Sequence, residues 1–220
     1  MHLYDVSKGF MGGYAIVGAQ MPIAVGLALA IKYRREDRAV LCFFGDGAVG
    51  CGEFHESMNL ASLWKLPILF FLENNLYGMG SHVDRTHAAG RDIYLAADAY
   101  KIQAAQVDGM DLMEVKEHTE KALERIRSGG GPVFLEAMTY RFRGHSITDP
   151  IAYRESSEVE QWQERDPIKL FKEFSLTEGL IDDENLAQIE TRVETTVAEA
   201  TQFAEDSDDP LPEALYDNVY

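Results

Sequence analysis

The chain has 220 residues, of which 46% are apolar, and this size and composition suit one α/β domain with a tail and a sizeable core. Its formal net charge of -17 argues against a nucleic-acid partner, because a phosphate backbone is bound by clusters of Lys and Arg. The apolar stretches are too short to span a bilayer and no export signal opens the chain, so we expect an intracellular protein without membrane contact.

The first half of the chain predicts a helix followed by a β-α-β unit. Residues 19–34 are apolar with small side chains at regular intervals, which indicates a helix. The continuous apolar runs at 39–44 and 67–72 are typical of buried strands. Residues 53–64 between them show helical spacing of apolar side chains, so the two strands should be parallel and joined by a right-handed crossover.

The second half continues the alternation. After a polar, irregular stretch at 78–91, the pattern predicts a short helix, a strand, a long amphipathic helix and a strand at 93–100, 102–107, 111–128 and 133–140. Two further helices are expected at 167–174 and 182–205. We therefore predict an α/β fold with a mostly parallel sheet, helices on both faces and a helical C-terminal tail. The proposed division is a domain at 1–154 and an acidic extension at 155–220.

Polar residues stand where the first two strands end. Gly45-Asp46-Gly47 follow the first strand, and Asn74-Asn75 follow the second. Carboxyl ends of neighbouring parallel strands meet at one edge of a sheet, so Asp46 and Asn75 should lie close together. One carboxylate, one amide oxygen, one backbone carbonyl and two diphosphate oxygens would satisfy Mg²⁺. The glycines beside Asp46 would let backbone N–H groups approach a phosphate at the start of a helix.

A second interpretation of the same segment is a dinucleotide site. Residues 45–50 match the G-x-G-x-x-G pattern after a strand and before a helix, and Glu73 stands where a ribose-binding acid would be expected. Against this interpretation, Asp46 would place an uncompensated carboxylate among the pyrophosphate oxygens, and the two asparagines would have no task. An NAD-binding Rossmann domain therefore stays as the alternative from a different class.

The segment after the last strand is rich in cationic groups. Arg141, Arg143 and Arg154 flank His145 and Ser146 in a chain that is otherwise acidic. Positive charge after a strand end predicts a loop that faces phosphate, and the alternative is a solvated loop whose arginines pair with nearby acids. His145 could donate a hydrogen bond to a phosphate oxygen or to a reacting group.

Four blocks in this order carry a family resemblance: Gly12–Gln20, Gly45-Asp46-Gly47 with Glu73–Gly80, Val107–Asp111 and Thr139–Ser146. On these residues, and over nearly the whole chain, it resembles the α subunits of the thiamine-diphosphate-dependent 2-oxo acid dehydrogenases, most closely those of pyruvate dehydrogenase (acetyl-transferring). The resemblance implies a thiamine-diphosphate-binding fold and a Mg²⁺ site formed by Asp46, Asn75 and the Tyr77 carbonyl. The implied cofactor contacts are Asp5, Ala15, Val17, Asp46, Gly47, Ala48, Asn75, Tyr77 and His145, and His145 is also the implied catalytic residue.

The same resemblance implies an activity and partners. These are oxidative decarboxylation of pyruvate, between glycolysis and acetyl-CoA biosynthesis, and acetyl transfer to a lipoyl group on a dihydrolipoyl acetyltransferase. A β subunit would supply the glutamate that activates the aminopyrimidine, in an assembly of two α and two β subunits. The expected location is the cytoplasm of a bacterium, or the mitochondrial matrix or plastid of a eukaryote. Branched-chain 2-oxo acid and acetoin dehydrogenase α subunits remain alternatives within the family.

The chain departs from the family pattern in two places. Val49-Gly50-Cys51 stand where relatives often carry polar residues, which changes the polarity at the entry of the following helix but leaves the metal ligands unchanged. The opening residues Met1-His2-Leu3-Tyr4 match an internal stretch of the family. We therefore expect a fragment that lacks a long N-terminal part, including a Tyr-Arg pair that relatives use against the diphosphate.

Overall fold

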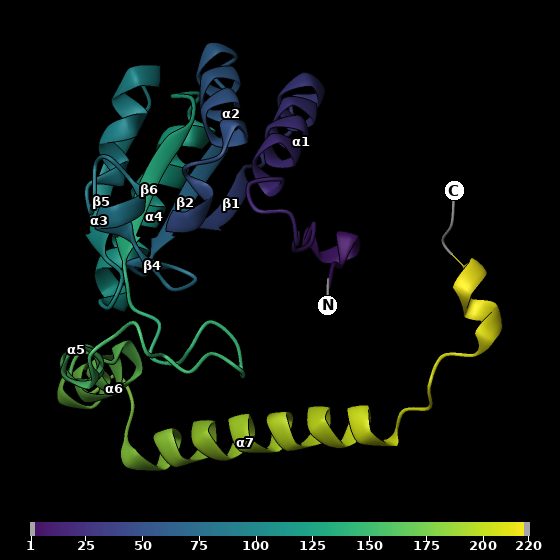
Figure 1. The fold of residues 1–220 in the computed structure, drawn as a ribbon, viewed down its shortest axis with the longest axis vertical. Helices are drawn as coiled ribbons and strands as arrows, with labels where there is room; N and C mark the ends of the chain where they lie inside the picture. Colours follow the sequence, from purple (N-terminus) through teal and green to yellow (C-terminus); the bar gives the residue numbers. More distant parts are fainter. Residues whose placement is uncertain (1–2, 218–220) are drawn as a thin grey trace. The chain divides into compact units, whose positions relative to one another are not determined.

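A computed structural model describes residues 3–217 (Figure 1). Met1 and His2, which open the stretch matched to the interior of the family pattern, lie outside the described residues. The chain forms two compact units, one that ends at Leu170 and one that begins at Phe171. The first unit holds a four-stranded parallel sheet, which confirms the predicted fold class. Its strands, in spatial order, are β1 (Val40–Gly45), β2 (Ile68–Asn74), β6 (Val133–Met138) and β5 (Gln103–Asp108).

Helices cover both faces of this sheet, as predicted (Figure 1). One face carries α1 (Gln20–Arg34), α2 (Gly52–Leu63) and the 3-10 helix η3 (Ile93–Tyr100). The opposite face carries α4 (Leu112–Arg127), which is capped by the Asp111 side chain. The two central strands, β2 and β6, are the most apolar, because nearly all of their side chains are buried between these layers.

The larger core cluster is built around aromatic rings. Phe44 on β1 lies edge-on to Phe54 on α2 and to Phe134 on β6, with ring centroids 6.1 and 6.0 Å apart. Phe54 and Phe134 are also edge-on to each other at 6.1 Å. Edge-to-face contacts at this spacing are favourable for aromatic quadrupoles and add to the burial of the rings. They join α2 to the middle of the sheet and so fix the position of the turn between β1 and α2.

β1 corrects one expectation, because it is buried on one face only. Phe44 is 3% exposed, whereas its neighbours Leu41 and Phe43 on the other face are 41% and 51% exposed. The reason is coverage: α4 packs against β2, β5 and β6 and leaves the edge strand open. Phe43 contacts a single ring, that of Phe71, at 5.1 Å. An apolar run shows that a strand is suited to burial but not whether a helix covers it.

Several short elements appear in stretches that we expected to be irregular. A small hairpin, β3 (Tyr77–Gly78) with β4 (Ser81–His82), leads into α3 (Val83–Thr86). The polar segment after 154 forms α5 (Ser156–Gln163). Trp162 on this helix stacks on Tyr140 with ring centroids 5.1 Å apart, so α5 belongs to the first unit. The remaining short elements are the 3-10 helices η1 (Val6–Lys8), η2 (Asp46–Ala48) and η4 (Pro212–Tyr216).

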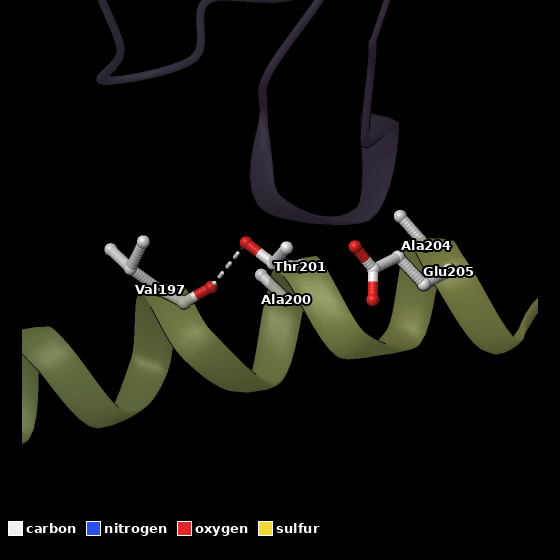
Figure 2. Close-up of a pocket in the computed structure, with 5 residues that line it drawn as sticks. All are labelled: Val197, Ala200, Thr201, Ala204 and Glu205. Carbon is white, nitrogen blue, oxygen red and sulfur yellow. Dashed lines mark hydrogen bonds between the residues drawn. The ribbon is translucent and has the colours of Figure 1, made fainter.

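Two helices complete the fold, α6 (Pro167–Thr177) and α7 (Asp183–Asp206). Asp182 caps α7 and forms a capping box with Asn185, as the sequence predicted for the start of this helix. Figure 2 shows a hollow along α7, where the Thr201 hydroxyl donates to the Val197 carbonyl. The hollow brings together no pair of groups suited to catalysis. Among residues 3–217, no helix is both long and apolar enough to cross a membrane.

The two faces of β1 give the first test. We expect Phe44→Ala to lower the free energy of unfolding by about 3–5 kcal/mol, because it leaves a cavity in the aromatic core. Phe43→Ala, one residue away, should cost less than about half as much, because half of its side chain is already in solvent. Chemical denaturation of both variants measures the difference, and equal losses would show that a cover is present on the open face of β1.

Candidate metal and phosphate site

The register between the edge strand β1 and its neighbour β2 brings the predicted site residues together. β1 and β2 are parallel neighbours, and Gly45 is paired with Glu73. Asp46 follows Gly45 directly and Asn75 lies two residues after Glu73, so both stand at the carboxyl edge of the sheet. The Asn75 backbone lies close enough to the Asp46 carboxyl to lower its pKa. The structure thus places these two predicted metal ligands in contact.

The Asp46 side chain is buried and only half satisfied. It is 6% exposed, and its Oδ2 atom has no hydrogen-bond partner within residues 3–217. Burial raises the pKa of this carboxyl, while backbone hydrogen bonds from Asp46 and Asn75 and the charge of Arg141 oppose that rise. A buried carboxylate oxygen without a donor is costly unless a cation or proton compensates it. Asp46 Oδ2 is therefore suited to a cation.

Two asparagines build the turn beside Asp46. Asn74 Oδ1 accepts the Leu76 N–H at 3.1 Å, and Asn75 Oδ1 accepts the Tyr77 N–H at 3.1 Å. Leu76, which follows the two asparagines, has a φ of 71°, in the left-handed region that a leucine rarely adopts. The side-chain hydrogen bonds offset this strain in the manner of Asx turns. The turn fixes the positions of Asn75 Oδ1 and of the Tyr77 carbonyl.

The Tyr77 carbonyl already has one donor. Arg141 Nη1 donates to it at 3.2 Å, and Arg141 Nη2 donates to the Met79 carbonyl at 2.8 Å and to the Tyr153 hydroxyl at 3.0 Å. A carbonyl oxygen has two lone pairs, so one remains for a metal ion. Arg141 thereby joins the β3–β4 hairpin to the loop that contains His145.

The glycines of the first turn serve a close backbone approach. A Cβ added at Gly78 would lie 3.2 Å from the Gly47 Cα, so the β3–β4 hairpin lies directly against the turn. The turn itself is the 3-10 helix η2, and α2 begins only at Gly52. Gly47 and Ala48 consequently do not stand at the first turn of α2, which corrects the expected helix-start geometry. The close approach of the hairpin to this turn explains Gly47 without a bound dinucleotide.

Arg154, one of the three arginines that predicted a phosphate-facing loop, instead binds groups of the chain itself. Arg154 is buried, and its guanidinium lies over the rings of three tyrosines at 5.2 to 5.6 Å. It also donates to the carbonyls of Arg141 and Arg143. Arg143 itself is exposed. Cation–π contacts of a desolvated guanidinium are worth about 2 kcal/mol, so Arg154 anchors the base of the loop.

Asp149 organises the loop around His145. Its carboxylate accepts the His145 N–H at 2.7 Å, the Ile151 N–H at 2.9 Å and the Tyr153 hydroxyl at 2.6 Å. The pKa of Asp149 falls to about 2, chiefly because of the Tyr153 hydroxyl. The structure fixes the backbone of His145 but leaves the residue exposed. Within residues 3–217, no hydrogen bond or ion pair joins its imidazole to Asp46.

Three further predicted contacts lie on the N-terminal segment. Asp5 bonds the Ser7 hydroxyl at 2.5 Å and pairs with Lys8 at 3.5 Å, and the Ser7 bond is the main reason that its pKa is lowered. Ala15 and Val17 are exposed. The Val17 carbonyl lies 3.7 Å from Cys51 Sγ, next to the start of α2. These contacts do not bring the three residues to the Asp46 turn.

Sequence reasoning missed one polar residue, Glu136 in the middle of β6. Its side chain is fully buried and accepts hydrogen bonds from Asn74, Tyr94 and Gln106. Burial raises the pKa of its carboxyl, and these donors oppose the rise. The sequence signal for this residue was a single acid inside the otherwise apolar run of β6. Such a run predicts a strand that is buried on both faces, so an acid within it must be buried too. The residue faces the turn that carries Asn75.

The donor set favours a hard cation. Among the described residues, no cluster of three or more His, Cys, Asp or Glu side chains could hold a metal ion by itself. What the sheet edge offers is one carboxylate, one amide oxygen and one backbone carbonyl. Oxygen donors of this kind suit Mg²⁺, which keeps coordination positions for water and phosphate.

Comparisons with known proteins give the following matches. A family model described as "Dehydrogenase E1 component" matches residues 1–213. The "Pyruvate dehydrogenase E1 component subunit alpha" of Rickettsia bellii is 42% identical over the whole chain, which covers 67% of that protein. The protein of the same name from Rhizobium meliloti is 42% identical, with 63% of it covered. A mitochondrial counterpart from Sminthopsis macroura is 43% identical, with 60% of it covered.

The unpartnered oxygen of Asp46 predicts a gain in stability on neutralisation. We expect Asp46→Asn to raise the melting temperature of the metal-free chain at neutral pH, because an amide replaces a buried, half-satisfied carboxylate at a saving of about 1–3 kcal/mol. Thermal unfolding in a chelator measures the change. Asp37→Asn, at an exposed aspartate, is the control and should have no effect. A lower melting temperature for Asp46→Asn would mean that the carboxylate is compensated within the fold.

Proposed function

The chain belongs to the dehydrogenase E1 component family, and we propose that it acts as the α subunit of a pyruvate dehydrogenase. The reaction is the oxidative decarboxylation of pyruvate, followed by acetyl transfer to a lipoyl group. The names of relatives at 41–43% identity support this choice of substrate. The observation that carries the chemistry is the buried, unpartnered Oδ2 of Asp46 beside Asn75 at the carboxyl edge of the sheet.

The cofactors of this proposal are thiamine diphosphate and Mg²⁺. Asp46, the Asn75 side chain and the Tyr77 carbonyl would hold the ion, and Gly47 and Ala48 would contact the diphosphate. The fit rests on the donor set, because Mg²⁺ takes carboxylate, amide and carbonyl oxygens together with phosphate. When bound, thiamine diphosphate supplies the carbanion stabilisation that decarboxylation of a 2-oxo acid requires. The protein supplies orientation, charge and exclusion of water.

His145 has the catalytic role in this proposal. Its exposed side chain, on a loop held by Asp149 and Arg154, would donate a proton or hydrogen bond to the diphosphate or to the reacting group. Asp5, Ala15 and Val17 remain proposed cofactor contacts, the last two against the aminopyrimidine. Their exposure is compatible with a site completed by other polypeptide.

The partners in the proposal are a β subunit, in an assembly of two α and two β subunits, and a dihydrolipoyl acetyltransferase. The β subunit would supply the glutamate that activates the aminopyrimidine, so this chain would hold the diphosphate half of a shared site. The location would be the bacterial cytoplasm, or the mitochondrial matrix or plastid in a eukaryote. Branched-chain 2-oxo acid and acetoin dehydrogenases are separated from this proposal by comparing kcat/KM for the three substrates.

Cofactor binding should require both Mg²⁺ and Asp46. In a reconstituted α/β assembly, we expect Asp46→Ala to weaken thiamine diphosphate binding by about 3 kcal/mol or more, because the ion loses its one charged protein ligand beside a diphosphate. Calorimetric titration with and without Mg²⁺ measures this, with Asp37→Ala as the matched control. Unchanged affinity in Asp46→Ala would remove the metal role. Saturable NAD binding lost in Gly47→Val would favour the dinucleotide interpretation instead.

His145 should matter for rate rather than for stability. We expect His145→Ala to reduce the decarboxylation rate about a hundredfold, the size of a lost general acid or base, with little change in melting temperature because the residue is exposed. Steady-state rates and thermal melts of the same preparations test it, with His118→Ala on α4 as control. A variant that loses stability but keeps its rate would mark His145 as structural.

A further inference from the structure

The carboxylate of Glu136 is an unusual group for the middle of a sheet. It is fully buried on β6, between the buried apolar residues Leu135 and Ala137. Burial of a carboxylate costs free energy even when it is hydrogen-bonded, and an apolar residue would often serve the fold as well. The fold alone therefore gives no reason for an acid at this position.

The three donors to Glu136 come from three different elements. Asn74 Nδ2, at the end of β2, donates to Oε1 at 2.7 Å. The Tyr94 N–H in η3 donates to Oε2 at 2.9 Å, and Gln106 Nε2 on β5 donates to the same oxygen at 3.2 Å. One oxygen is thus devoted to Asn74. Charge-assisted hydrogen bonds of this length are among the stronger ones in proteins.

The bond to Asn74 decides which way its amide group points. The Nδ2 side of the amide faces Glu136, and the Oδ1 side accepts the Leu76 N–H at 3.1 Å. An ionised carboxylate can only accept, so it selects this orientation. With the amide reversed, Nδ2 would face the Leu76 N–H and two donors would oppose each other. Glu136 therefore makes Asn74 an acceptor towards the turn.

That acceptor holds the turn in its strained form. Leu76 keeps its left-handed φ of 71° while Asn74 bonds its N–H, and the next residues on either side are Asn75 and Tyr77. We propose that Glu136 is a positioning residue of the metal site, which fixes the Asn74–Tyr77 turn through the Asn74 amide and touches neither metal nor cofactor. This inference rests on the proposed function, in which Asn75 and the Tyr77 carbonyl bind the ion.

Glu136→Gln is the direct test, made in the α/β assembly. The introduced amide has one oxygen, so it can accept either from Tyr94 and Gln106 or from Asn74. On the other side its NH2 group then faces another donor, and the two repel. We expect Mg²⁺-dependent affinity for thiamine diphosphate to fall at least about tenfold, and the Leu76 and Tyr77 amides to exchange hydrogen faster. Gln106→Leu is the matched control, because it removes a donor from the same carboxylate on the side away from the turn. Its affinity should change by less than about twofold.

A swap of polarity should rescue the site. In Asn74→Asp/Glu136→Gln, the Gln amide donates to the aspartate and accepts from Tyr94 and Gln106, while the aspartate still accepts the Leu76 N–H. All donors are again paired and the total charge is unchanged, so we expect affinity and amide protection to return to within about threefold of the wild type. If Glu136→Gln alone does not fold, this double variant decides: tight binding supports the proposal and weak binding overturns it.

The other outcomes are also decisive. Unchanged affinity and protection in Glu136→Gln, or an equal loss in Gln106→Leu, would show that Glu136 acts only on general stability and would overturn the proposal. If the wild-type assembly itself does not bind thiamine diphosphate with Mg²⁺, the proposed function fails. The rate of hydrogen exchange at the Leu76 and Tyr77 amides, compared between the wild type and Glu136→Gln, then still decides whether Glu136 fixes the turn.

Discussion

The parallel register between β1 and β2 is the constraint on which the site depends. Pairing of Gly45 with Glu73 makes the two strands end within one residue of each other, so that Asp46 and Asn75, the first residues after them, lie close together. A shift of one residue would exchange the faces of every side chain on β2, so that the side chains that pack in one core cluster would have to fit the other. Phe44 on β1 also lies edge-on to Phe70 on β2, with ring centroids 6.4 Å apart, so the packing of the core supports this register and thereby the positions of the oxygen donors.

The buried carboxylates of Glu136 and Asp46 are compensated in different ways. Glu136 receives three hydrogen bonds from groups of the protein, and its charge is compensated internally. Asp46 has one oxygen without any partner in the described structure, so its compensation must come from outside. The contrast separates the two roles: one acid holds the chain, and the other is available to a cation.

The sequence was enough to predict the strands, the main helices and the proximity of Asp46 to Asn75. These features depend on local apolar runs and on the parallel pairing of the strands. The half-open β1 could not, since the coverage of Phe43 depends on where α4 docks. The β3–β4 hairpin was missed because two-residue strands leave no periodic signal. Arg154 was misjudged because its partners are rings and carbonyls distant in sequence. Whether the predicted residues contact cofactor stays a prediction.

The strand order has a consequence for how the chain folds. β6 lies between β2 and β5 but follows both in sequence, so each of them is synthesised before its central neighbour exists. Until β6 inserts, their open edges are exposed to wrong pairing, and closure of such non-local parallel contacts is slow. Glu136 arrives on that same strand. The Asn74 amide therefore gains its acceptor only at the final closure of the sheet, so the hydrogen bonds of the Asn74–Tyr77 turn are completed last.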